Sequence, residues 1–277
     1  VGGDVMLGTY VDRRGLDWDG GKAAWFRGTF GDLSFDGGNG AVASKLAGAQ
    51  FGLDMVQFGG PETRAGLTVS VSAQGAAVAM PGGAFAGTTQ IASTGVGAYL
   101  THAEGAFYAD LLGQYRFLDI DVTAPTSAGK VDGHAIDVAA EIGAHWDVSD
   151  NTRITPMGQL IYQHVALRDA TLGGIDFAFG KSDALIGRAR IMAETTVGDV
   201  TTFVSAGVSH DLFDGTETTA SNSTWVTALG GTRAELAGGF EGKFGGGLSA
   251  FGAGEVTITV DGVSRSYVGR AGIRTEF

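Results

Sequence analysis

Alternation of apolar and polar residues is the feature that most limits what this chain can fold into. The last twelve residues show it most strictly, with uncharged residues at Tyr267, Gly269, Ala271, Ile273, Thr275 and Phe277 and with three charges among Val268, Arg270, Gly272, Arg274 and Glu276. A period of two residues indicates a β-strand with two different faces. In a soluble sandwich the uncharged face would meet a core, whereas in a membrane barrel it would meet lipid while the charges face a wet lumen.

Segments of this kind follow one another from Trp25 to the C-terminus. They predict twelve strands, at Trp25–Gly31, Leu46–Gln57, Thr63–Ala77, Thr94–Thr101, Ala106–Ile120, His134–Asp147, Arg153–Leu167, Leu185–Thr195, Thr201–Asp211, Trp225–Glu241, Leu248–Val260 and Ser266–Phe277. Most are near the ~9–11 residues that a tilted strand needs to cross a bilayer, or somewhat longer. No stretch approaches the roughly 18 apolar residues of a spanning helix, so the chain is expected either to be soluble or to cross a membrane as a barrel.

The connectors between these segments fall into two classes. Five are short, and their first residues lie 44, 46, 49 and 46 residues apart: Phe58–Glu62, His102–Gly105, Val148–Thr152, Val197–Val200 and Lys243–Gly246. Between them we expect longer loops rich in Gly, Asp, Ser and Thr, at Leu33–Ser44, Ala79–Ser93, Val122–Gly133, Arg168–Asp183 and Leu212–Thr224, with a short exception at Asp261–Ser264. Short turns at one end and long loops at the other are typical of outer-membrane barrels, whose short turns are periplasmic. A β-propeller would need about four strands in each period, and this chain has two.

Composition supports the barrel and argues against a nucleic-acid partner and against any site built on cysteine. Only 17% of the residues are charged and the mean hydropathy is +0.13, which suits a wall wetted by lipid outside and water inside. The net charge of −12 argues against nucleic acid. The chain has no Cys, which removes disulfides, thiolate nucleophiles and Cys-based metal sites.

Several stretches resemble the C-terminal β-domain of classical (type Va) autotransporters. They are Trp25–Gly31 (WFRGTFG), Ala49–Asp54 (AQFGLD), Gly97–Leu100 (GAYL), Phe107–Leu111 (FYADL), Ile154–His164 (ITPMGQLIYQH) and the terminal Gly-x-Arg-x-x-Phe from Gly272 to Phe277. They occur in order and at the spacing of that family across Trp25 to Phe277. The resemblance implies a 12-stranded antiparallel transmembrane β-barrel (an all-β fold) in the outer membrane of a Gram-negative bacterium, acting in type V secretion.

The resemblance also implies that residues 1–24 are a linker or plug and that residues 25–277 are the barrel. With an even number of strands, the chain enters the first strand and leaves the last on the same side. An external passenger can then be joined to the first strand only by a segment that threads the lumen. Twenty-four helical residues would span about 36 Å at ~1.5 Å each, enough for a hydrocarbon core of ~30 Å. We expect this segment to be helical from Asp4 to Arg14, or partly extended.

Candidate site residues follow from the inward parity of the strands. Lumen-lining or plug-contacting positions are Arg27, Gln50, Asp54, Tyr108, Asp110, Arg116, Asp137, Glu141, Gln159, Arg188 and Arg270. Charges facing lipid near mid-membrane would cost about 2–4 kcal/mol, so these side chains should point inward, where they could pair with each other or with Arg13 and Arg14 of the linker. A solvated lumen without a specific plug site remains an equal alternative. By resemblance to the family, Glu141 and Arg188 are expected to form a pair.

Catalysis and metal binding have little support in the sequence. The five histidines show no metal-ligand spacing, no Gly-x-Ser-x-Gly elbow is present, and adjacent His210 and Asp211 would point to opposite faces of a strand. We therefore expect no enzymatic activity of the barrel, no metal and no cofactor, although cleavage of the linker inside the barrel is left open. The alternatives to a translocator are a stand-alone porin or barrel enzyme and, from another class, a soluble β-sandwich adhesin.

The expected partners are outer-membrane lipid, the chain's own N-terminal passenger, and the barrel-assembly machinery with periplasmic chaperones, with the barrel acting as a monomer. By resemblance to the family, the final strand is the membrane-insertion signal, carried by Tyr267, Ile273 and the terminal Phe277. The same strand must pair with the Trp25 strand, because closure removes unpaired edges from the bilayer.

Overall fold

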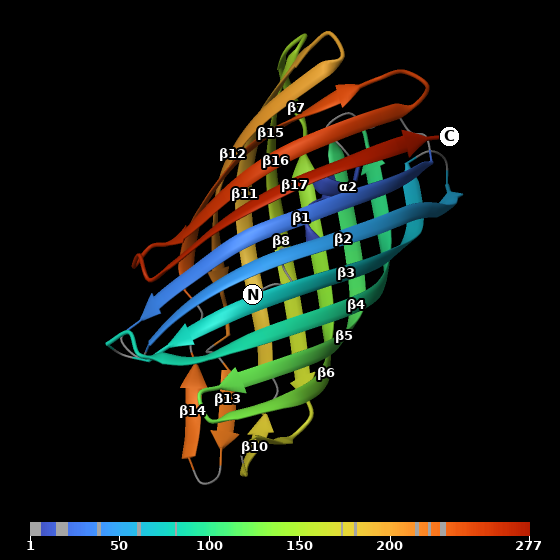
Figure 1. Cartoon of the computed structure of the whole chain (residues 1–277). Coiled ribbons are helices and arrows are strands. Elements are labelled where there is room, and N and C mark those ends of the chain that lie inside the picture. Colours follow the sequence, from blue (N-terminus) through green and yellow to red (C-terminus); the bar gives the residue numbers. More distant parts are fainter. Residues whose placement is uncertain are drawn as a thin grey trace.

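A long antiparallel sheet closes on itself in this protein. The computed structural model describes residues 7–14, 22–37, 40–59, 62–80, 82–172, 174–179, 182–213, 216–220, 223–227 and 231–277. Within them, twelve long strands pair in a ring (Figure 1). These are β1 (Ala23–Gly37), β2 (Gly40–Phe58), β3 (Thr63–Ala79), β4 (Phe85–Glu104), β5 (Phe107–Ala124), β6 (Ser127–Ala144), β8 (Thr152–Leu167), β11 (Ser182–Val197), β12 (Val200–Asp211), β15 (Thr232–Lys243), β16 (Leu248–Thr259) and β17 (Ser264–Glu276). The predicted 12-stranded barrel is confirmed.

The first and last strands form the seam of the barrel. β1 and β17 pair antiparallel without interruption from Ala23↔Glu276 to Phe35↔Ser264. Beyond the last ladder pair, the backbone N–H of Phe277 donates to the carbonyl of Lys22 at 2.9 Å. The ring therefore has no open strand edge, which is the condition for a sheet to survive in hydrocarbon.

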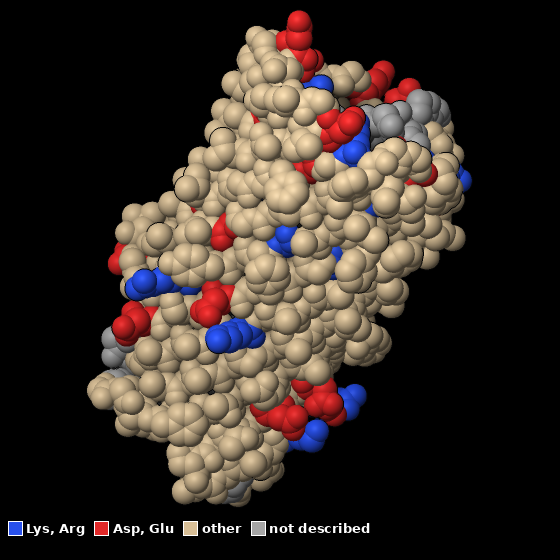
Figure 2. Space-filling view, turned by 45° about the horizontal axis from the view of Figure 1, so that its top comes forward, with Lys and Arg blue, Asp and Glu red and all other residues tan. Residues whose placement is uncertain are grey.

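The outer wall of the barrel is apolar. Large hydrophobic side chains stand exposed along every ring strand, among them Phe26, Phe51, Leu67, Val69, Val96, Leu111, Leu160, Ile191, Val204, Leu236, Tyr267 and Ile273. Figure 2 shows charged side chains gathered mainly toward the ends of the molecule, with most of the wall between them uncharged. The alternate positions are buried and mostly polar. On β17, for example, Arg270 and Arg274 are buried while Tyr267 is 50% exposed, so the strand has the two faces that its alternation predicted.

The two ends of the barrel differ, as the connectors predicted. The end that holds the five short connectors and the start of β1 is called here the turn end, and the opposite end the loop end. At the turn end, Gly105 and Gly198 adopt φ values of +58° and +61°. Only glycine adopts this left-handed backbone without strain, and it lets the chain reverse within two residues.

At the loop end, two predicted loops are wrong. Leu33–Ser44 and Val122–Gly133 are mostly strand, since β1 pairs with β2 as far as Gly37↔Gly40 and β5 with β6 as far as Ala124↔Ser127. Their polar composition looks like loop sequence, yet a hairpin that projects into water needs no apolar face. Cross-strand ion pairs support such hairpins, as between Lys130 and Asp121 at 3.2 Å. The predicted Ala79–Ser93 loop likewise shrinks, because β4 already begins at Phe85.

Other predicted segments are interrupted or divided. The His134–Asp147 strand breaks at His145 into β6 and β7 (Trp146–Ser149). The interruption lies between the pairs Gly143↔Met157 and Trp146↔Ile154, where β8 contains Pro156, which has no N–H for the ladder. The single strand predicted at Trp225–Glu241 is wrong. Its start belongs to β14 (Ser223–Thr227) and its end to β15, with Gly231 at a φ of +145° before β15, a conformation that ends regular pairing.

A second, smaller sheet stands at the loop end, formed by β9 (Ala170–Leu172), β10 (Ile175–Phe179), β13 (Thr216–Ala220) and β14. Strands β9 and β10 cover one side of the lumen mouth. Ala170 and Phe179 pack there against a cluster of apolar residues on β5 and β6, namely Leu118, Ile120, Val131 and Ala135. The two longest predicted loops, Arg168–Asp183 and Leu212–Thr224, therefore contain strands of their own.

The predicted N-terminal helix is shorter than expected. Helix α2 spans Tyr10–Arg14 and lies inside the ring toward the turn end (Figure 1). The predicted N-cap, Asp4, and the irregular stretch from Gly15 to Gly21 lie outside the described residues. Among the described residues, no helix is long and apolar enough to cross a membrane.

We expect the deletion of Phe277 to reduce the fraction of folded barrel severalfold, because it removes the last hydrogen bond of the seam and an exposed aromatic side chain. Folded barrel is measured by its altered migration on unheated denaturing gels, both in cells and after refolding of the purified chain into detergent. The control is Phe244→Ala, which removes a similarly exposed ring from the β15–β16 turn. Equal folded fractions for the two variants would contradict a special role of the chain end.

Candidate functional site: the plugged lumen

The segment just before and within α2 is held by its backbone. The carbonyl of Leu7 accepts hydrogen bonds from Arg27 Nη2 at 3.3 Å and Arg13 Nη1 at 3.4 Å. The carbonyl of Gly8 accepts one from Gln159 Nε2 at 3.2 Å. Gly8 has a φ of +68°, which turns the chain between these two contacts. The segment thus meets the walls at β1 and at β8, on different sides of the ring.

The side chain of Leu7 belongs to an apolar cluster inside the lumen. It is fully buried and belongs to one cluster with Trp25, Tyr99, Leu112, Ala139, Ile161 and Ile186. The other members come from β1, β4, β5, β6, β8 and β11, so the cluster that includes this leucine draws on six of the twelve ring strands. An apolar cluster that includes a residue of the N-terminal segment favours a segment packed against the wall over one that lies loosely in water.

Arg13 is the charged anchor of α2. Its guanidinium forms a short ion pair with Asp110 of β5, and both side chains are 3% exposed. Asp110 also accepts a hydrogen bond from Thr101 Oγ1 at 2.5 Å. The Arg13 guanidinium carbon lies 5.9 Å from the ring centre of Tyr99, within the range of a cation–π contact. Because a buried charge without a partner is costly, this pair fixes where α2 can sit.

Tyr99 links Arg13 to the start of β1 through Asp54. Its hydroxyl donates to Asp54 Oδ1 at 2.5 Å, and Asp54 Oδ2 accepts from the backbone N–H of Ala23 at 2.9 Å. The Tyr99 ring lies flat over Gly66, where a Cβ atom would come within 2.3 Å of the ring. Glycine at this position therefore permits the orientation of Tyr99 that the contacts with Arg13 and Asp54 require.

Glu141 of β6 accepts a hydrogen bond from the first residue of α2, Tyr10. The backbone N–H of Tyr10 lies 3.4 Å from each carboxylate oxygen, so the carboxylate satisfies an N–H that the helix leaves without an internal partner. Tyr108 donates its hydroxyl to Glu141 at 2.8 Å, and its ring stacks on the Tyr10 ring with centroids 4.2 Å apart. Gln159 donates to the same carboxylate at 3.0 Å. Glu141 thus joins α2 to β5, β6 and β8.

The expected pair of Glu141 with Arg188 is wrong. Arg188 donates to Glu235 Oε1 at 3.0 Å and to Gln159 Oε1 at 2.7 Å. Gln159 lies between the two predicted partners, since its amide nitrogen bonds Glu141 and its amide oxygen accepts from Arg188. The Arg188 side chain instead extends past β12 to β15, where the Glu235 carboxylate accepts its hydrogen bond.

The remaining predicted residues lie in other parts of the lumen. Arg116 and Asp137 form a two-contact ion pair between β5 and β6, at 2.5 and 3.0 Å, away from the contacts of α2. Gln50 accepts from Arg27 at 2.6 Å. Arg14 is the last residue of α2, and its side chain lies outside what the structure describes.

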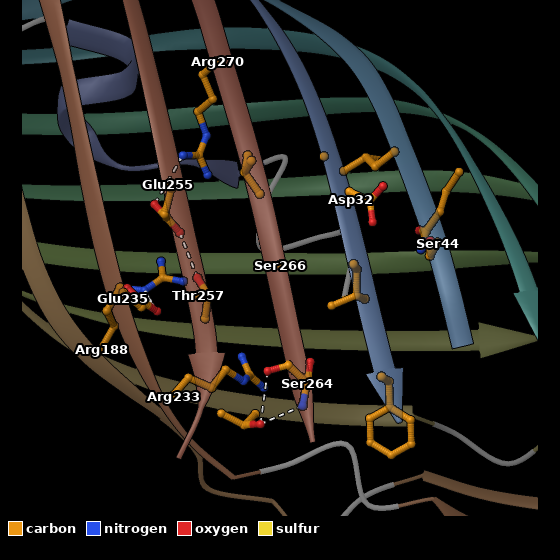
Figure 3. Close-up of a pocket in the computed structure, with 17 residues that line it drawn as sticks. Asp32, Ser44, Arg188, Arg233, Glu235, Glu255, Thr257, Ser264, Ser266 and Arg270 are labelled. Carbon is orange, nitrogen blue, oxygen red and sulfur yellow. Dashed lines mark hydrogen bonds and ion pairs between the residues drawn. The ribbon is translucent and has the colours of Figure 1, made fainter. Parts of the chain in front are cut away.

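A group of charged residues lies on one side of the lumen, and the sequence predicted only its members Arg188 and Arg270 as lumen-lining. Glu235 bonds Arg188 and Arg190, the latter at 2.7 Å, while Glu255 bonds Arg190 at 3.1 Å and Arg270 at 3.4 Å. We call Arg188, Arg190, Glu235, Glu255 and Arg270 the ionic wall. It borders a cavity of about 100 Å³ that β1 and β2 close on the far side (Figure 3). The inward parity of these strands was readable from the sequence, but the partner of each charge was not.

Leu7, Tyr10 and Trp25 were also missed, because only polar residues were sought as plug contacts. The signal for Trp25 was its inward parity on β1. For Leu7 and Tyr10, which lie in a segment without clear periodicity, no signal was available.

The described part of the lumen holds neither a candidate metal site nor the His210–Asp211 dyad. No three His, Asp or Glu side chains among the described residues are placed to hold a metal ion. His210 bonds Thr232 at 3.0 Å, whereas Asp211 accepts from the backbone of Leu185 and Phe213, so these neighbours do not form a dyad. The described contacts hold a peptide segment in place.

Comparison with known proteins gives a family match and a shared fold. The model of the autotransporter β-domain family matches residues 24–255. The transport unit of the autotransporter AIDA-I from Escherichia coli is similar in structure, with a TM-score of 0.83 at 18% identity over 92% of this chain and 90% of that chain. The translocator domain of NalP from Neisseria meningitidis has a TM-score of 0.76 at 17% identity, over 93% and 88% of the chains. The β-domain of the Bordetella autotransporter BrkA has a TM-score of 0.64 at 16% identity, over 93% and 100%. A search of curated proteins found no match.

Arg13→Met is expected to loosen the segment, because it leaves the buried Asp110 carboxylate without its cation at a cost of about 3–5 kcal/mol. Single-channel conductance of the purified barrel in planar bilayers should rise severalfold or begin to fluctuate. The double variant Arg13→Met/Asp110→Asn should recover part of the closure, since it removes both charges. Lys22→Met is the matched control, because Lys22 is a cation of the same segment outside the lumen contacts. Unchanged conductance in Arg13→Met would show that the pair does not hold the segment.

Proposed function

This chain belongs to the autotransporter β-domain family, and we propose that it delivers its passenger through a lumen that Leu7–Arg14 then plugs. As a member of that family, it is an outer-membrane translocator of a Gram-negative bacterium with an N-terminal passenger. The turn end is then periplasmic and the loop end faces the outside. In the proposal, secretion ends when the passenger has left the lumen and the segment that follows it, Leu7–Arg14, docks there.

The observation that carries the proposal is the set of contacts around α2. Arg13 meets Asp110 of β5, and the N–H of Tyr10 meets Glu141 of β6. Leu7, just before α2, belongs to the apolar cluster of the lumen. A lumen built only as a solvated pore has no need of such contacts. The segment also leads directly into β1 at Ala23, whose N–H is bonded to Asp54.

Three further roles are part of the proposal. The final strand, with Tyr267, Ile273 and Phe277, acts as the signal that the barrel-assembly machinery and periplasmic chaperones recognise. The barrel works as a monomer, because the closed ring needs no second copy to complete it. The barrel itself performs no catalysis, in keeping with the absence of a dyad at His210 and Asp211 among the described contacts.

Fusion of a small folded reporter ahead of Val1 tests the proposed function. We expect the reporter to become accessible to external protease in intact cells, in an amount that follows the amount of folded barrel. A barrel that folds and inserts but leaves every reporter in the periplasm would contradict the proposal. The control is the same reporter exported with a signal peptide but without the barrel.

A stand-alone porin is the alternative, and conductance separates it from a plugged translocator. We expect the intact chain to conduct weakly and the chain lacking residues 1–22 to conduct several times more, because the lumen contacts of Leu7, Tyr10 and Arg13 are then lost. A porin would conduct strongly with the segment in place. High conductance of the intact chain, unchanged by the truncation, would favour the porin.

A further inference from the structure

From its middle toward the loop end, the lumen has two unlike sides: one carries charged residues and the facing one does not. The ionic wall of β11, β15, β16 and β17 holds arginines and glutamates that bond one another. The facing strands β2, β3 and β4 have no charged residue at their inward positions from the middle of the lumen toward the loop end. We call these positions the neutral wall, and they are Ser44, Leu46, Gly48, Gln50, Gly52, Gly66, Thr68, Ser70, Ser72, Gln74, Ser93, Gly95 and Gly97.

Glycines make the neutral wall flat. Gly95 lies in register between Ser70 of β3 and Arg116 of β5, and Gly97 lies between Thr68 and Gln114. A Cβ atom at Gly95 would come within 2.4 Å of the Gln114 amide and 2.6 Å of Ser70 Oγ, and one at Gly97 within 2.7 Å of Thr68 Oγ1. The polar side chains of the neighbouring strands therefore lie down over the glycines, which makes a smooth surface of amides and hydroxyls.

Part of this surface has hydrogen-bonding capacity that the described contacts leave unused. The Gln50 amide nitrogen and the Thr68 hydroxyl are buried atoms without a hydrogen-bond partner, and so are Thr29 Oγ1 and Gln114 Oε1 at the borders of the wall. Gln50 is 1% exposed and Thr68 is 3% exposed. Buried polar groups are nearly always bonded, yet the described contacts leave such atoms on both sides of the lumen, since the Ser249 hydroxyl of β16 also lacks a partner. The neutral wall differs in having no charged side chain among its positions. Its unused atoms, with those at its borders, include donors and acceptors, which is what a peptide backbone requires.

We propose that the neutral wall is the surface along which the passenger slides as an extended chain, exchanging hydrogen bonds with its backbone. The inference rests on the translocator function proposed above. An extended chain in a narrow lumen must satisfy an N–H and a C=O at nearly every residue. Amides and hydroxyls serve every sequence alike, and each such bond is weak enough to be replaced as the chain advances.

The ionic wall is unsuited to this role because its charges already satisfy one another. Glu235 bonds two arginines, and Arg190 bonds two glutamates. An unpaired arginine or glutamate in the lumen would hold passenger residues of opposite charge and repel those of like charge. The five residues of the ionic wall neutralise one another, whereas Arg233 of β15, which lines the same cavity, has no ion pair among the described contacts. The neutral wall carries no charge, so it offers no trap for charged passenger residues.

The double variant Gln50→Met/Thr68→Val tests the inference, because it removes the unused polar atoms at nearly constant volume. The reporter fusion is pulse-labelled, and its appearance at the cell surface is timed with external protease and divided by the amount of folded barrel. We expect transit to slow at least threefold. The matched control is Ser205→Ala/Ser249→Ala, which removes two buried inward hydroxyls from β12 and β16. The Ser249 hydroxyl also lacks a partner but lies outside the neutral wall, so the control should leave the rate unchanged.

The chemistry of the passenger provides a second measurement. A reporter linker rich in Pro offers fewer N–H groups than one rich in Ser and Gly, so its transit should depend less on Gln50 and Thr68. Equal rates for the wild type and Gln50→Met/Thr68→Val would overturn the inference, as would equal slowing by the control. Loss of surface exposure in the wild-type fusion would instead overturn the proposed function, so the two failures are distinguishable.

Discussion

The hydrogen-bonded seam between β1 and β17 is the constraint on which the rest of the molecule depends. A bilayer offers no water to backbone groups, so a sheet can exist there only if every strand has two neighbours. Continuous pairing from Ala23 to Phe35 meets that condition. Once the ring is closed, every strand has one face toward lipid and one toward the lumen. These two environments explain why apolar and polar residues alternate along the chain.

Closure also creates an enclosed polar interior in which charges must find partners. The lumen resolves this in two ways. On the side of the ionic wall, arginines and glutamates on neighbouring strands neutralise one another. Near the turn end, Asp110 and Glu141 are matched by groups of the N-terminal segment, namely the guanidinium of Arg13 and the N–H of Tyr10. The wall is therefore electrostatically complete at that end only when the segment is in place.

The sequence predicted the fold better than the site. Alternation and connector length gave the twelve strands, the closure and the inward parity, because period and polarity are local properties of a sequence. Hairpin ends such as Leu33–Ser44 were misread, since polar strands outside a bilayer have the composition of loops. Inward parity also selected Glu141, Gln159 and Arg188, but their partners depend on strand register and side-chain length. Leu7 and Tyr10 act through packing inside a cavity that exists only after the barrel has closed, which no local pattern can show.

The strands of the ring are unequal in length. β4 has 20 residues and β2 has 19, whereas β16 has 12. At ~3.4 Å per residue the longest strand extends roughly 27 Å farther along its own direction than the shortest. Short turns align the strands at one end, so the difference appears at the other, where the main sheet extends farthest along β2–β6 and least along β16 and β17. The β13–β14 hairpin is inserted between β12 and β15 at that same end. A polypeptide that leaves the lumen therefore meets a taller wall beside β2–β6 than beside β16 and β17, so the exit is asymmetric.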